Sequence, residues 1–289
     1  MKQRMDVKII MDQHTPRIKV EPFEYIDGSF DILCRNLHTL VGIQPNSVNY
    51  DCINENNLIP AQFCYSSVAV VEEVAYRYSN LFEIGDKVVI TPYLKKYIGV
   101  EDLKKEQRII YKKGNSGIDD VDSLFYPLIC YALALLDEIE GYQNILFLGC
   151  NLIGILLLKL FHEENIAPFV CLDELDVSEK LLYKNGANKV IQFTNGGFSE
   201  IVDKCDVIIL NSYPENIVNE IQTKYPHIPI VKGKQWNREQ ESRAFNILLQ
   251  QSIQFDDLIS HHEHAENILL LTEELKLNKY NGKAIVFDW

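Results

Sequence analysis

The stretch that decides the fold is residues 144–173, NILFLGCNLIGILLLKLFHEENIAPFVCLD. It opens with an apolar run of strand length, 145–148, which a glycine follows. The next residues form a helix pattern in which apolar side chains recur every three or four positions, so that one face is buried. A second apolar run, 169–172, ends at Asp173. This order of strand, glycine turn, helix, strand and acid is typical of the start of a dinucleotide-binding βαβ unit.

Each position of the turn has a physical role in binding a pyrophosphate. Gly149 lets the chain turn sharply, and Gly154 lets the helix approach the sheet closely. The first N–H groups of the helix then face the phosphates. Asp173 would accept hydrogen bonds from a ribose diol and repel a 2′-phosphate, which favours NAD over NADP. The cofactor-binding candidates here are Gly149, Asn151, Leu152, Ile153, Gly154 and Asp173.

One position departs from the G-x-G-x-x-G pattern, because Asn151 replaces the middle glycine. Asparagine is the non-glycine residue that best tolerates a left-handed backbone. Its side chain, however, stands where a phosphate should come close. A Rossmann-like domain that no longer binds a nucleotide is therefore the alternative interpretation.

Composition limits the classes of partner. The 289 residues are 47% hydrophobic and 24% charged, which are globular values. The net charge of −13 argues against a nucleic-acid partner, since there is no basic stripe to neutralise phosphates. No apolar run approaches the roughly 18 residues of a membrane span, and the polar first residues do not resemble a signal peptide. We therefore expect a cytoplasmic protein with a small-molecule substrate.

The flanking sequence predicts two units. Before about residue 125 it predicts a β-rich unit, with strands at 7–10, 17–20, 30–33, 67–76 and 87–91. A helix at 122–140 would bridge the two units. After Asp173 the pattern alternates, with helices expected at 177–184, 215–223, 237–252 and 262–275 and strands at 189–193, 206–210, 227–232 and 284–287.

With these pieces placed, the chain resembles the medium-chain dehydrogenase/reductase superfamily, the relatives of zinc-type alcohol dehydrogenase. The family's "VGDRV" looks like Ile84-Gly85-Asp86-Lys87-Val88, and its "GA" after the second Rossmann helix looks like Gly186-Ala187. The ending from 258 to 289 is similar to the family's "ITH…GKVVL" close. The resemblance implies an α/β protein in which a GroES-like β-rich domain, 1–125, is completed by about 255–289. A doubly wound, parallel-sheet Rossmann domain, 126–254, lies between them.

The resemblance is weakest at the active site. Residues 34–38, Cys-Arg-Asn-Leu-His, look like the segment of the family's first zinc ligand, and Cys64-Tyr65-Ser66 stands where the family has Gly-His-Glu. The family's "EPL" looks like Tyr126-Pro127-Leu128, close to Cys130. Metal ligands are thus missing, and the four-cysteine structural zinc lobe is absent from the sequence. We expect no catalytic zinc; Tyr65 and His38 are then candidate proton donors or relays, and Arg35 is expected near the pyrophosphate or an acidic substrate.

Two metal alternatives remain open. Cys34, Cys64 and Cys130 stand near the family's ligand positions and could form a substitute thiolate site, although most of the seven cysteines fit buried core positions better. The run 261–264, His-His-Glu-His, is followed by Glu266. His262 and Glu266 have i,i+4 spacing, but capping of the helix expected there explains these residues better than a metal.

The chain is also short for this superfamily. After 227–232 the family has a further Rossmann edge strand, which in many relatives pairs two subunits, whereas here the sequence passes almost directly into the next helix. We therefore expect a monomer or an atypical dimer. Two functions remain: an NAD(H)-linked oxidoreductase of a small alcohol or carbonyl, such as a sugar or polyol in biosynthesis, or a degenerate relative that binds a ligand or a partner protein without redox chemistry.

Overall fold

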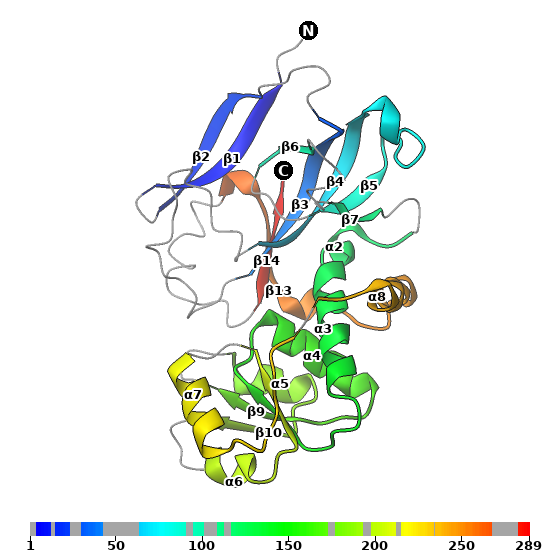
Figure 1. The fold of residues 1–289 in the computed structure, drawn as a ribbon. Coiled ribbons are helices and arrows are strands. Elements are labelled where there is room, and N and C mark those ends of the chain that lie inside the picture. The colour runs from blue at the N-terminus through cyan, green and yellow to red at the C-terminus, as the bar shows by residue number, and fades with distance from the viewer. Residues whose placement is uncertain are drawn as a thin grey trace.

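A computed structural model describes most of the chain, and its elements form two parts stacked end to end (Figure 1). The described residues are 4–12, 15–23, 30–42, 64–90, 95–100, 109–112, 117–172, 177–192, 198–211, 215–233, 235–267 and 283–289.

The first part is built on a seven-stranded sheet. Its strands are β3 (Ile32–Gly42), β4 (Cys64–Val74), β5 (Lys87–Ile90), β6 (Tyr97–Val100), β7 (Ile109–Lys112), β13 (Ile259–His264) and β14 (Ala284–Asp288). The order is β13-β14-β3-β4-β5-β7, with β6 also paired to β3, and every pair is antiparallel except β13 with β14. A separate hairpin pairs β1 (Met5–Asp12) with β2 (Thr15–Pro22). The sheet thus joins strands from both ends of the sequence.

The second part is a parallel sheet of the order β10-β9-β8-β11-β12. Its strands are β8 (Ile145–Leu148), β9 (Phe169–Leu172), β10 (Lys189–Gln192), β11 (Val207–Leu210) and β12 (Ile230–Val231). The connecting helices are α4 (Leu152–Glu163), α5 (Glu179–Lys184), α6 (Phe198–Val202) and α7 (Glu215–Lys224). This is the doubly wound order of a mononucleotide-binding unit, with β8 as its central strand.

Two helices connect the parts. After the short α2 (Asp120–Ser123), α3 (Tyr126–Glu138) packs beside α4 and α8 (Arg238–Gln250). The largest hydrophobic cluster runs continuously from Leu40 and Val68 of the first sheet through α3 to α4. The rings of Phe125 and Phe255 stack there, 4.6 Å apart. The two parts therefore share one core.

Most local predictions agree with these elements, and three need correction. The helix expected at 122–140 is two helices, because the chain breaks at Leu124 and Phe125. The helix expected at 262–275 begins as strand β13, followed by a single 3₁₀ turn, Ala265–Asn267; residues 268–275 lie outside the described part. The strands β6 and β7 had no sequence signal. The expected loss of the last Rossmann edge strand is confirmed, since within the described residues the parallel sheet ends at β12 and α8 follows.

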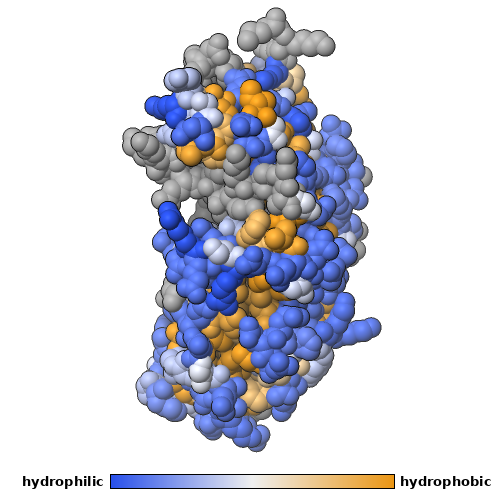
Figure 2. Space-filling model, turned by 90° about the vertical axis from the view of Figure 1, so that its right-hand side faces the viewer, coloured by the Kyte–Doolittle hydropathy of each residue, from blue (hydrophilic) through white to orange (hydrophobic). Residues whose placement is uncertain are grey.

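The surface seen in Figure 2 is mainly hydrophilic, with apolar patches in the upper, middle and lower parts of the view. This agrees with a chain that carries 41 acidic and 28 basic side chains. Within the described ranges, no helix has both the length and the apolar character needed to cross a bilayer.

Candidate functional site

The turn after β8 has the backbone that a dinucleotide site requires. Gly149 adopts a φ of 72°, a left-handed conformation that favours glycine. It follows the carboxyl end of β8, whose four residues are all buried between β9 and β11. The sheet order reverses at this strand, and ligands of open α/β sheets bind at such switch points.

Asn151 does not adopt the left-handed conformation expected for it. Its φ of −104° and ψ of −165° are extended, and it is the N-cap of α4. Its Oδ1 atom accepts hydrogen bonds from the N–H groups of Ile153, at 3.0 Å, and Gly154, at 3.3 Å. A third hydrogen bond comes from Nδ2 of Asn211, at 2.8 Å. The side chain thus takes up N–H groups that would otherwise face a phosphate, which sequence reasoning did not anticipate.

Gly154 shows the close packing that its place in the motif predicts. A Cβ atom at this position would lie 2.7 Å from Nδ2 of Asn211 and 2.7 Å from Sγ of Cys150. Both distances are far shorter than van der Waals contact. The first turn of α4 therefore approaches the end of β11 as closely as a residue without a side chain permits.

The remaining nucleotide candidates lie around this turn. Leu152 and Ile153 are the first two residues of α4, where helical N–H groups lack intrahelical partners. Asp173 lies outside the described residues. It follows directly after Leu172, the last residue of β9, and β9 lies parallel beside β8. Its place in the sequence is thus next to the carboxyl end of the neighbouring strand.

Arg35 has an ion-pair partner within the first sheet. It is the fourth residue of β3, and its Nε atom donates a 2.8 Å hydrogen bond to Oε1 of Glu72 on β4. The end of β3 that faces α2 and α3 is Gly42. It lies seven residues after Arg35, which corresponds to about 23 Å of extended chain. A place for Arg35 near the pyrophosphate or an acidic substrate therefore stays a prediction; its observed partner is a carboxylate within the sheet.

Tyr65 occupies the opposite end of the same sheet. It is the second residue of β4, whose first residue, Cys64, pairs with Val41 near the end of β3. The adjacent Ser66 is buried, and its hydroxyl donates to the carbonyl of Leu124 just before α3. This hydrogen bond fixes the start of β4 against the helix that leads to the Rossmann domain. The side chains of Tyr65 and Cys64 lie outside the described part.

Two of the three cysteines considered for a thiolate site belong to different hydrophobic clusters. Cys34 is packed in the sheet core with Ile32 and Val71, whereas Cys130 belongs to the cluster around α3. Both are fully buried. Loss of solvation raises the pKa of each thiol to about 12. Each of these two thiols is thus a core residue, and the thiolate site with Cys64 stays an untested alternative.

His38 has partners that sequence reasoning missed. Its Nδ1 atom lies 2.6 Å from Oδ1 of Asp288, and Nε2 of His262 lies 2.7 Å from the same oxygen. Burial opposes the charge of Asp288, but the hydrogen bonds and charges of His262 and His38 outweigh it and lower the pKa of this carboxyl below its usual value. A proton relay through His38 remains a prediction, and its observed neighbours belong to β13 and β14.

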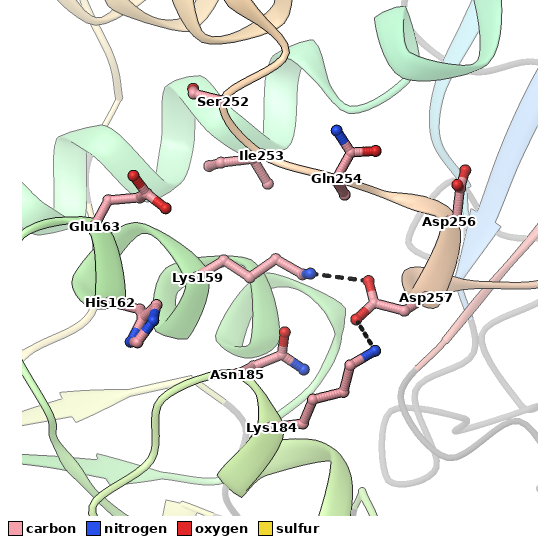
Figure 3. Close-up of a pocket in the computed structure, with 10 residues that line it drawn as sticks. All are labelled: Lys159, His162, Glu163, Lys184, Asn185, Ser252, Ile253, Gln254, Asp256 and Asp257. Atoms are coloured by element: carbon pink, nitrogen blue, oxygen red, sulfur yellow. Dashed lines mark hydrogen bonds and ion pairs between the residues drawn. The ribbon is translucent and has the colours of Figure 1, made fainter.

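A pocket of about 450 Å³ lies at the other end of α4 from the glycine turn (Figure 3). At its edge, Asp257 bridges two lysines, with oxygens 2.8 Å from Nζ of Lys159 and 3.1 Å from Nζ of Lys184. In the structure, Asp257 attaches the segment after α8 to two helices of the parallel sheet.

Comparison with known proteins finds similarity in structure only. No family model matches the chain, and no curated protein matches it in sequence. Similar solved structures include an alcohol dehydrogenase, rspB, from Escherichia coli CFT073 complexed with NADH (13% identity, TM-score 0.72, 99% of this chain and 100% of that chain). Galactitol-1-phosphate dehydrogenase from Escherichia coli is 11% identical, with a TM-score of 0.72 and the same coverage.

A third such structure is a putative zinc-binding dehydrogenase from Sinorhizobium meliloti 1021 bound to NADP (13% identity, TM-score 0.69, 99% of this chain and 100% of that chain). The likeness covers both domains in each case, and at these identities it concerns the fold. From end to end, this chain has the fold of the zinc-type alcohol dehydrogenase-like enzymes, the medium-chain dehydrogenase/reductases, with a GroES-like domain and a Rossmann domain.

Proposed function

We propose that this protein is an NAD(H)-linked oxidoreductase that acts on a small alcohol or carbonyl compound, such as a sugar or polyol, without a catalytic zinc. The observation that carries the proposal is the β8–α4 turn. Gly149 is left-handed, there is no room for a Cβ atom at Gly154 beside Asn211 and Cys150, and the turn lies at the switch point of a parallel sheet. The dehydrogenases of similar fold, two of which hold NADH or NADP, support this choice.

The residues of the turn fit a dinucleotide at most positions. The N–H of Leu152 points out of the N-terminal end of α4, where the helix dipole favours a pyrophosphate. Asp173 would hold the ribose hydroxyls. Asn151 would have to turn its amide away so that the N–H of Ile153 could reach the phosphate. A bound nicotinamide supplies hydride exchange with the substrate carbon.

The protein would supply the proton for that exchange. In our proposal Tyr65 lies at the end of β4 nearest to the Rossmann domain, and its phenol can donate to or accept from a substrate oxygen. Ser66 holds this end of β4 against Leu124. The loss of a carboxylate and an imidazole at these positions is why the proposal omits zinc.

The capping by Asn151 favours a second candidate function. The amide oxygen of Asn151 accepts hydrogen bonds from the N–H groups of Ile153 and Gly154, as a bound phosphate would otherwise do at the start of the helix. A protein that keeps the fold without nucleotide would need such a cap. In this second reading the chain binds a ligand or a partner protein and performs no redox chemistry.

Calorimetric titration of the purified protein with NADH and NADPH distinguishes the two candidate functions. We expect micromolar binding of NADH and weaker binding of NADPH. Asp173→Ala should weaken NADH binding by about tenfold or more, the usual effect of removing hydrogen bonds to a charged group. Asp203→Ala, an exposed carboxylate of the same domain, is the matched control. If wild-type protein binds neither nucleotide, the redox function is excluded and the second candidate stands.

A further inference from the structure

Two histidines and an aspartate converge on one face of the seven-stranded sheet, away from the glycine turn. They are His38 of β3, His262 of β13 and Asp288 of β14. One ligand atom from each lies within 4.8 Å of the other two. The nucleotide proposal uses neither His262 nor Asp288.

The strand register explains why these side chains meet. His38 pairs with Asp288 across β3 and β14, and His264 pairs with Asp288 across β13 and β14. Paired residues of neighbouring strands point to the same face, and so do residues two apart in one strand. His262 therefore shares the face with the other three. Strand β3 and the two C-terminal strands β13 and β14 thus present imidazole and carboxylate groups to a single point.

The geometry is close to that of a metal site. A carboxylate oxygen only accepts hydrogen bonds, so Nδ1 of His38 and Nε2 of His262 both carry hydrogen where they approach Oδ1 of Asp288, at 2.6 and 2.7 Å. Zinc binds nitrogen and oxygen ligands at about 2.0–2.2 Å in a tetrahedron, which places ligand atoms about 3.3 Å apart. Each separation would need to open by less than about 1 Å. The hydrogen on each bonding nitrogen would move to the other ring nitrogen, so a neutral imidazole stays neutral.

The backbone on both sides of the cluster is held in place. Trp289, next to Asp288, donates from its backbone N–H to the carbonyl of Leu37 at 3.1 Å and from Nε1 to Oγ1 of Thr39 at 2.9 Å. Both acceptors flank His38. Asp288 and His38 are therefore fixed relative to one another before any ion binds, which lowers the entropic cost of binding.

The cluster is also open to solvent. The side chains of His38, Asp288 and His262 are 23%, 36% and 45% exposed. An ion could enter without rearrangement of the sheet. A fourth position would remain for water or for a side chain such as His264, which lies beside Asp288 in the register.

We propose that His38, His262 and Asp288 form a binding site for a divalent transition-metal ion, with zinc as the reference ion. Two imidazoles and one carboxylate suit zinc and its first-row neighbours, whereas magnesium and calcium prefer all-oxygen sites. The ion would cross-link β3 to the strands that return from the Rossmann domain. The proposal is independent of nucleotide binding.

Zinc titration of the chelator-treated full-length protein near neutral pH, without nucleotide, tests this site. We expect one equivalent of zinc to bind, and magnesium not to bind at the same concentration. His262→Ala and His38→Ala should each weaken zinc binding by at least about tenfold. His227→Ala, an exposed histidine between α7 and β12, should leave it unchanged.

A thermal melt and the cobalt(II) spectrum give independent readouts. Zinc should raise the Tm of the wild-type protein and of His227→Ala, but not that of His262→Ala, because only a bound ion stabilises the native state. Cobalt(II) should give the visible absorption of a tetrahedral site in the wild type and lose it in His262→Ala. Circular dichroism checks that each variant is folded. Absence of zinc binding to wild-type protein, or binding that survives both histidine substitutions, would overturn the proposal.

Discussion

Asn151 stands at the point where a dinucleotide would approach α4 most closely. Its amide oxygen accepts hydrogen bonds from two N–H groups of the first turn and from Asn211. An asparagine N-cap stabilises a helix by about 1 kcal/mol, and a glycine at the same position costs only a few tenths. The residue can therefore be exchanged without loss of the fold, and its effect on ligand binding can be measured separately.

We predict that Asn151→Gly raises the affinity for NADH by about three- to tenfold. The substitution frees the N–H groups of Ile153 and Gly154 and restores the glycine pattern of the turn. Titration calorimetry measures the affinity, and Asn237→Gly, which removes the N-cap of α8, is the matched control. Unchanged or weaker NADH binding by Asn151→Gly would show that the amide does not compete with phosphate.

At the scale of single elements, β13 shows how a local pattern misleads. Residues 259–264, Ile-Ser-His-His-Glu-His, have no alternation of apolar and polar residues, and a helix was expected from 262 onward. The segment is an edge strand that pairs with β14 alone among the described strands. Its backbone partners, and not its own side chains, decide its conformation, as is common for strands.

The turn at 256–258 is the second element with a testable role. Asp257 contacts Lys159 of α4 and Lys184 of α5 (Figure 3). Burial disfavours the charge of Asp257 most strongly, but the hydrogen bonds and charges of the two lysines together outweigh burial, so the pKa of the carboxyl lies below its usual value. Ionisation of Asp257 is therefore more favourable in the native state than in the unfolded chain, so the charged form stabilises the fold.

We predict that Asp257→Asn lowers the free energy of unfolding by about 1–2 kcal/mol at neutral pH, as expected for a half-buried ion pair. Since the folded-state pKa is depressed, this stabilisation is present above the unfolded pKa of about 3.9 and is lost as the pH falls through the lower folded value. Urea unfolding of both proteins between neutral and acid pH measures the difference, which should shrink toward low pH. Asp256→Asn, which changes the exposed neighbouring carboxylate, is the control. If the wild type and Asp257→Asn differ in unfolding free energy by the same amount at every pH, the ionised Asp257 is not the source of the stabilisation.

At the scale of the whole molecule, the parallel sheet ends in a very short strand. The described part of β12 is Ile230–Val231, paired to β11 by two residues, and α8 follows within a few positions. Such an edge offers few backbone groups for pairing with a second sheet. The face shown in Figure 2 is mostly hydrophilic, as suits a chain with a net charge of −13.

We predict that the protein is a monomer, because within the described residues the parallel sheet ends at β12 and has no further edge strand with which a second subunit could pair. Light scattering after size-exclusion chromatography should give a mass near 33.4 kDa over the micromolar range. The same measurement at high salt controls for repulsion between the acidic chains. A mass that doubles with concentration would instead place a dimer interface on another surface.

The sequence by itself determined the elements whose patterns are local. The apolar runs of β8 and β9, the helical spacing of α4 and the glycines at 149 and 154 are written within thirty consecutive residues. Together they predicted the central unit of the parallel sheet. The shortness of the chain after β12 likewise predicted the loss of an edge strand.

Only the tertiary structure decided which polar side chains meet. His38 and Asp288 are 250 residues apart, Lys159 and Asp257 come from different segments, and Asn151 meets Asn211 across two strands of the sheet. The same holds for Arg35, whose partner Glu72 depends on the register of β3 and β4. Periodicity records which face of an element is buried, but it carries no information about which face of a distant element lies opposite. Contacts of that kind arise only when elements that are distant in the sequence pack against one another.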